Sequence, residues 1–216
     1  MLIDHFTWIP QIWVSSFLKI TLVAGGTTSF SGIDGNGRGP APDITKAVLT
    51  PELWNPAVPT RWSPVAPMQV PRLYHSTGGL LPDGRVYVAG GGKLAGFTDQ
   101  RTAEIFSPPY LFRGQRPLIT GMVSQLGNNQ VRYGESFTVL TSNTTITRAT
   151  LMRLPSGTHS LNFNQRFNEL STVVKVAGGY RVTAPPNGKV CPPGHYYLHL
   201  INAAGVPSVA TIIKVL

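Results

Sequence analysis

The chain has 216 residues, enough for one large domain or two small ones, and 42% of them are hydrophobic, so it can bury a core and wholesale disorder is excluded. Its 23 glycines and 19 prolines predict many turns and exclude long helices, because both residues are poor helix formers. The formal net charge is +9, but the 18 Lys and Arg residues are scattered singly, so we expect no nucleic-acid partner.

Targeting signals are weak. No stretch reaches the eighteen or so apolar residues of a membrane span, so no membrane partner is expected. Residues 1–18 carry Asp4 and His5 where a secretory signal would have basic residues, so no signal peptide is expected and this stretch stays unassigned. The single cysteine, Cys191, cannot form an internal disulfide, so cysteine usage does not indicate a compartment.

From Lys19 the sequence predicts strands in a repeated order. Residues 19–26 are a β-branched run ended by a Gly pair, and a long glycine-rich loop follows at 27–43. Residues 46–54 predict a second strand that ends in an aromatic residue, and a Pro-rich connector leads onward over 55–71.

The clearest local pattern is a β-hairpin over residues 74–92. Its turn is Pro82-Asp83-Gly84, where Pro fixes φ and Gly accepts a left-handed position. Residues 102–112 then repeat the order of strand, proline and aromatic residue. Strands ended by Gly-Gly and followed by a strand and a large aromatic residue are typical of kelch-type propeller blades, so residues 19–115 are expected to form about two blades.

After Arg116-Pro117 the pattern changes to short strands with polar turns. About seven strands at hairpin spacing in roughly 100 residues favour an immunoglobulin-like β-sandwich. We therefore expect an all-β chain: a partial kelch-type β-propeller over 19–115, followed by a β-sandwich over 116–216.

Histidines are the first candidates for a metal site. His195 and His199 are four positions apart on one predicted strand; about 13 Å along a strand separates them, so they cannot share an ion and are expected to be half-exposed. His75 follows Tyr74 at the start of a strand, and His159 lies in a polar stretch between sandwich strands. Spacing alone does not single out a metal site.

Four motifs in register resemble the C-terminal part of the galactose oxidase and glyoxal oxidase family of copper radical oxidases. They are RLYHSTGGLLPDGRVYVAGGG, EIFSPPYLFRGQRPLIT, LPSGTHSLNFNQRFNEL and PPGHYYLHLINAAGVPSVATIIKV. The resemblance covers residues 46–216 well, 19–45 weakly and 1–18 not at all. It implies the last blades of a kelch propeller and an immunoglobulin-like domain of the E-set type.

The resemblance also implies a copper site. The axial tyrosine and neighbouring histidine of the family correspond to Tyr74 and His75, and the histidine from its C-terminal domain corresponds to His159. Two imidazoles and a phenolate suit Cu(II), and Tyr74 would be the catalytic general base that accepts the proton of a bound primary alcohol. The implied substrates are a small alcohol, sugar or aldehyde together with O2, and the implied location is extracellular.

The chain departs from the family in one respect. The family holds its radical on a tyrosine cross-linked to a cysteine, and neither residue has a counterpart here, since Cys191 lies in the sandwich and is expected to be a small, partly buried residue. The chain is therefore expected to be a C-terminal fragment of such an oxidase, inactive alone, with the remaining blades as its partner. The alternative is a non-catalytic module that binds carbohydrate or protein.

Four further residues lie near the expected ligands in sequence or in the family's pocket. Arg72, Arg153 and Arg166 could orient a substrate, although surface or strand-pairing roles are favoured. Phe30 lies in the glycine-rich loop, where the family often lines its pocket with an aromatic residue.

Overall fold

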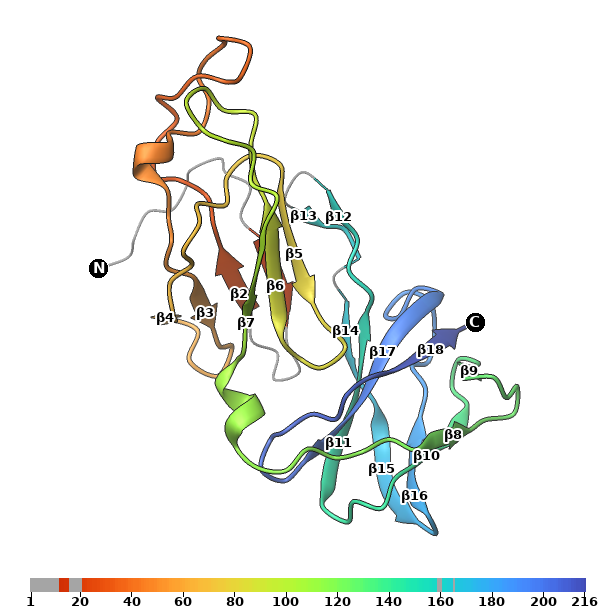
Figure 1. The fold of residues 1–216 in the computed structure, drawn as a ribbon. Helices are drawn as coiled ribbons and strands as arrows, with labels where there is room; N and C mark the ends of the chain where they lie inside the picture. Colours follow the sequence, from red (N-terminus) through yellow and green to blue (C-terminus); the bar gives the residue numbers. More distant parts are fainter. Residues whose placement is uncertain (1–11, 16–20, 159–160, 165) are drawn as a thin grey trace. The chain divides into compact units, whose positions relative to one another are not determined.

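The computed structural model describes residues 12–15, 21–158, 161–164 and 166–216 (Figure 1). These residues form strands and loops, with two short 3-10 helices, η1 (Ile44–Lys46) and η2 (Pro109–Phe112). The predicted all-β class is confirmed. Within the described residues, no helix is long and apolar enough to cross a membrane.

The described residues divide into two compact units. The first unit joins the described residues up to Leu80 with Val86–Phe106 and Pro155–Phe163. Besides the two-stranded pair of β12 (Gly157–Thr158) and β13 (Leu161–Asn162), it contains two antiparallel sheets, as expected of neighbouring propeller blades. One sheet has the order β1 (Ile12–Ser15), β2 (Thr21–Ala24), β3 (Glu52–Trp54), β4 (Trp62–Pro64), and the other β5 (Ser76–Leu80), β6 (Val86–Gly90), β7 (Ala103–Phe106).

Two details of the first sheet differ from the prediction. Residues 46–50 are not a strand: Lys46 ends η1, whose cap Asp43 accepts hydrogen bonds from the Thr45 backbone N–H (2.9 Å) and hydroxyl (2.7 Å), and Ala47 makes only an isolated bridge with Thr27. Strand pairing starts only after Pro51, at Glu52. The Pro-rich connector contains a strand that the sequence did not predict, β4, whose Pro64 is tolerated because β4 is an edge strand.

The second unit comprises Leu81–Arg85, Ser107–Leu154 and Asn164–Leu216. Nine of its strands form two sheets with a shared buried core, so the sandwich prediction is confirmed. One sheet is β15 (Ser171–Val176), β16 (Gly179–Thr183), β10 (Ser136–Leu140), β8 (Gly121–Val123); the other is β14 (Phe167–Glu169), β11 (Ile146–Arg153), β17 (Gly194–Asn202), β18 (Thr211–Val215), β9 (Gln130–Val131).

Alternation along the strands explains the sandwich core. Side chains that point inward from the two sheets, among them Phe137, Leu151, Leu198 and Ile213, are at most 2% exposed. Burying such side chains stabilises the fold by about 1.5–3 kcal/mol each relative to leaving them in water. The predicted turn after β5 also forms, with Leu81 and Arg85 paired through a backbone hydrogen bond of 2.8 Å and Gly84 at φ +82°.

Candidate metal centre

Tyr74 and His75 form a tight turn directly before β5. The backbone N–H of Ser76 donates to the carbonyl of Leu73 (3.0 Å), which closes a four-residue turn. His75, the third residue of this turn, has φ +63°. A positive φ at this position is typical of a type II turn and is unusual for a residue with a side chain. Both side chains are exposed, and their rings lie 3.9 Å apart between centroids at 47°.

Backbone contacts on both sides hold this turn. The Gly26 N–H donates to the carbonyl of Arg72 (2.9 Å), and the Gly92 N–H donates to the carbonyl of Tyr74 (2.8 Å). Leu73 is fully buried in a small apolar cluster with Ala41 and Leu94. The backbone of the turn is therefore held by these contacts, while the rings of Tyr74 and His75 are exposed.

The glycines that end the predicted strands make this close packing feasible. A Cβ on Gly25 would lie 2.5 Å from the Arg72 carbonyl oxygen, and Gly25 has φ +77°. A Cβ on Gly90 would lie 3.0 Å from the His75 carbonyl oxygen, and Gly90 has φ +73°. Side chains would be strained at both positions and would push the turn away.

A second hairpin packs on the same strand as the turn. It consists of β12 (Gly157–Thr158) and β13 (Leu161–Asn162), both of which contact β5. Close approach again depends on glycine, because a Cβ on Gly157 would lie 2.5 Å from the Thr77 hydroxyl oxygen. The third predicted ligand, His159, lies outside the described residues.

The donor chemistry of Tyr74 and His75 fits copper. A phenolate oxygen and an imidazole nitrogen are both accepted ligands of Cu(II), and both side chains are exposed to an incoming ion. In the part of the chain that the structure describes, no three His, Cys, Asp or Glu side chains gather as an alternative metal site. These two residues are therefore the candidate metal ligands among the described residues.

The histidines of β17 are placed differently from the expectation of two half-exposed residues. His195 is exposed, whereas His199 is completely buried with Nε2 3.2 Å from the Pro82 carbonyl oxygen. Burial lowers the pKa of His199 to about 3. Cys191 is also fully buried, rather than partly buried as expected, and burial raises the pKa of its thiol.

The three arginines near the candidate ligands in sequence differ in environment. Arg72 is fully buried. Arg153 lies over the ring of Tyr196, 5.8 Å from its centroid, and its backbone N–H donates to the carbonyl of Arg166, whose side chain is exposed. The exposed side chain of Arg166 has the surface role that was favoured. Phe30 is half-buried in its loop.

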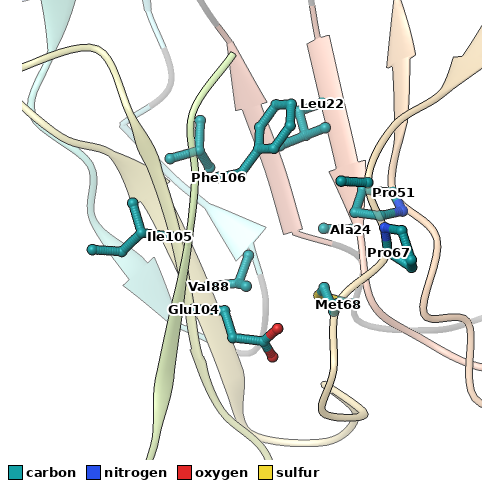
Figure 2. Close-up of a pocket in the computed structure, with 11 residues that line it drawn as sticks. Leu22, Ala24, Pro51, Pro67, Met68, Val88, Glu104, Ile105 and Phe106 are labelled. Atoms are coloured by element: carbon teal, nitrogen blue, oxygen red, sulfur yellow. The ribbon is translucent and has the colours of Figure 1, made fainter.

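An apolar pocket in the first unit is not the candidate site. It measures about 100 Å³ and lies between β2, β7 and the segment around Pro67 and Met68 (Figure 2). Ligand pockets are usually 300–1,000 Å³. Glu104 is its one charged lining residue, and neither Tyr74 nor His75 lines it.

Known proteins resemble this chain over most of its length. Residues 116–215 match the family model described as "Galactose oxidase-like, Early set domain". A "Galactose oxidase" of Gibberella zeae is 34% identical over 202 residues, covering 93% of this chain and 29% of the relative. An "Aldehyde oxidase GLOX" of Vitis pseudoreticulata is 39% identical over 180 residues, covering 74% of this chain and 33% of the relative.

A solved structure agrees with these relatives. It is a fungal alcohol oxidase of the AA5 family in complex with copper, with a TM-score of 0.82 and 29% identity over 95% of this chain and 42% of that chain. The chain thus spans a third or less of the length of the two curated relatives.

Proposed function

The chain belongs to the galactose oxidase and glyoxal oxidase family, and from this we propose that Tyr74, His75 and His159 are copper ligands of an alcohol or aldehyde oxidase. The observation that carries the proposal is the outward-facing pair of Tyr74 and His75, held on a strained turn at φ +63°. Strain of this kind persists where the surrounding contacts fix it, and it concentrates at functional sites.

The proposed reaction converts a primary alcohol and O2 into an aldehyde and hydrogen peroxide; an aldehyde with water and O2 would give a carboxylic acid and hydrogen peroxide. Copper, when bound, would supply the redox centre and an acidic site for the substrate oxygen. The role of His75 would be to bind copper through its imidazole. Tyr74 binds and accepts the hydroxyl proton of the substrate at its Oη.

The proposal assigns copper binding to this chain but not turnover. The family's cross-linked tyrosine and cysteine have no counterpart in these 216 residues, whose only cysteine is buried in the sandwich core. A chain with three ligands and no radical partner would bind copper without completing the two-electron oxidation. The remaining propeller blades would be its partner, and an extracellular location follows from the family.

Copper titration tests the proposal. We expect the full chain to bind one Cu(II), and His75→Ala and Tyr74→Phe each to weaken that binding about tenfold or more, because each removes a donor. The matched control is His195→Ala, which removes another exposed imidazole from a strand of the second unit. Unchanged affinity in His75→Ala would refute the copper site and favour a carbohydrate- or protein-binding module.

A peroxide assay tests the second half of the proposal. The copper-loaded chain, incubated with galactose, methylglyoxal or a simple primary alcohol, is expected to release no more hydrogen peroxide than free copper does. Catalytic peroxide release that disappears in Tyr74→Phe would contradict the assignment of turnover to residues outside this chain.

A further inference from the structure

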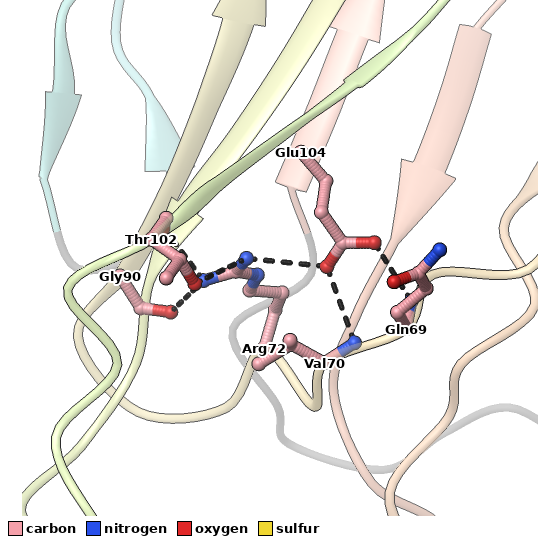
Figure 3. A network of polar contacts seen from close by, with 6 residues as sticks. All are labelled: Gln69, Val70, Arg72, Gly90, Thr102 and Glu104. Carbon is pink, nitrogen blue, oxygen red and sulfur yellow. Dashed lines mark hydrogen bonds and ion pairs between the residues drawn. The ribbon is translucent and has the colours of Figure 1, made fainter.

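An ion pair between the buried Arg72 and the partly exposed Glu104 lies close to the candidate ligands in the chain. The side chain of Arg72, two positions before Tyr74, is 0% exposed. Its Nη1 donates to the carbonyls of Gly90 (3.0 Å) and Thr102 (2.9 Å), and its Nη2 donates to the Thr102 hydroxyl (3.2 Å) and to Oε1 of Glu104 (3.1 Å), as Figure 3 shows.

Glu104 fixes the backbone that leads into the ligand turn. Its Oε2 accepts a hydrogen bond from the Gln69 N–H (2.7 Å) and its Oε1 accepts one from the Val70 N–H (3.2 Å), in addition to the bond from Arg72 (Figure 3). One carboxylate on β7 therefore holds three groups of the segment 69–72. Charge-assisted hydrogen bonds of this kind are about twice as strong as neutral ones.

Arg72 also connects the ligand turn to the ends of two strands. Its guanidinium bonds Gly90, the last residue of β6, and its own carbonyl accepts from Gly26, just after β2. Gly90 in turn lies against the backbone of His75. The orientation of the turn is thus set by where Arg72 is held.

The burial of Arg72 argues against a purely stabilising role for the Arg72–Glu104 pair. Burying the Arg72 guanidinium carries a large desolvation cost, and its partner Glu104 is 25% exposed, so water weakens the attraction that would offset this cost. A site that must hold two ligands in one geometry gains from a rigid fork of hydrogen bonds, which arginine supplies.

We propose that Arg72 and Glu104 are positioning residues that hold Tyr74 and His75 in copper-binding geometry. This inference rests on the proposed function. Neither side chain is itself a ligand; they act through the backbone of residues 69–75. Loosening them should change how copper is bound as well as how stable the chain is.

Two substitutions at one position separate charge from geometry. Glu104→Gln keeps the shape, but it removes the charge and replaces one accepting oxygen with an NH2 group, so at least one of the hydrogen bonds that Glu104 accepts is lost. Glu104→Asp keeps the charge, but its shorter side chain cannot reach Gln69, Val70 and Arg72 together. The matched control is Glu169→Gln, which removes the carboxylate of the Arg148–Glu169 pair in the second unit (2.5 Å).

The experiment measures Cu(II) affinity of the full chain by competition with a chelator, and the electron paramagnetic resonance spectrum of the bound copper. We expect Glu104→Gln to lose about tenfold in affinity and Glu104→Asp somewhat less, as for other residues that orient metal ligands. Both should shift the spectrum, whereas Glu169→Gln should keep the wild-type affinity and spectrum.

Wild-type affinity and spectrum in Glu104→Asp would overturn the inference, even if its melting temperature falls. If Glu104→Gln fails to fold, Glu104→Asp decides alone. Failure of the proposed function is a different result, since it appears as unchanged affinity in His75→Ala whatever the Glu104 variants do.

Discussion

The left-handed backbone of His75 predicts a difference in stability between two variants that both lack its imidazole, His75→Gly and His75→Ala. His75 has φ +63°, a conformation that destabilises the folded state by about 1–2 kcal/mol for an L-residue and not for glycine. About 0.5–1 kcal/mol of this advantage is lost, because glycine has more conformational freedom in the unfolded chain. His75→Gly is therefore expected to be about 1 kcal/mol more stable than His75→Ala.

The comparison is clean because both variants remove the same imidazole and the same ring contact with Tyr74. Thermal unfolding of the copper-free chains, followed by circular dichroism, should place the midpoint of His75→Gly about 2–4 °C above that of His75→Ala. Both should bind copper equally poorly. A midpoint for His75→Gly at or below that of His75→Ala would refute the strained turn.

Three further outcomes follow from buried groups. Gly25→Ala should destabilise the chain by about 2–4 kcal/mol in urea, because its Cβ would meet the Arg72 carbonyl oxygen at 2.5 Å and a left-handed backbone would be strained; an unchanged midpoint would contradict the contact. Burial lowers the pKa of His199 to about 3, so His199 binds fewer protons in the folded than in the unfolded chain. As the pH is lowered from about 6.5 to about 4, the free energy of unfolding should therefore decrease by up to about 1.4 kcal/mol per pH unit. His199→Gln should flatten this slope. Cys191, with a buried thiol of raised pKa, should react with a disulfide reagent only after guanidinium unfolds the chain, and rapid reaction of the native chain would argue against its burial.

Local signals in the sequence explain the parts of the fold that were predicted correctly. The turn Pro82-Asp83-Gly84 is specified by the conformational preferences of its own residues, and Arg85 pairs with Asp83 at 2.7 Å. The alternation of β18 likewise specifies a sandwich strand. The strand predicted over 46–54 is shorter in the structure, Glu52–Trp54, and its first residue, Lys46, belongs instead to the 3-10 helix that Asp43 caps.

Contacts between distant residues could not be predicted from spacing. Glu104 pairs with Arg72 across 32 positions, and nothing in either segment indicates the other. The burial of His199 depends on Pro82, 117 positions away, so strand periodicity alone gave the wrong exposure. The assignment of Tyr74 and His75 came from the family motif, since Tyr-His is an unremarkable dipeptide.

The contacts that fix the turn of Tyr74 and His75 bear on how copper would be bound rather than on how it would react. Among the described residues, the hydrogen bonds given above for the turn run between residues 26 and 104, within the first unit. These contacts within the first unit hold His75 at φ +63°, with its ring tilted by 47° against that of Tyr74. Under the proposed function, copper affinity can therefore be measured without turnover, and variants of Glu104 should lower the affinity of this chain for copper.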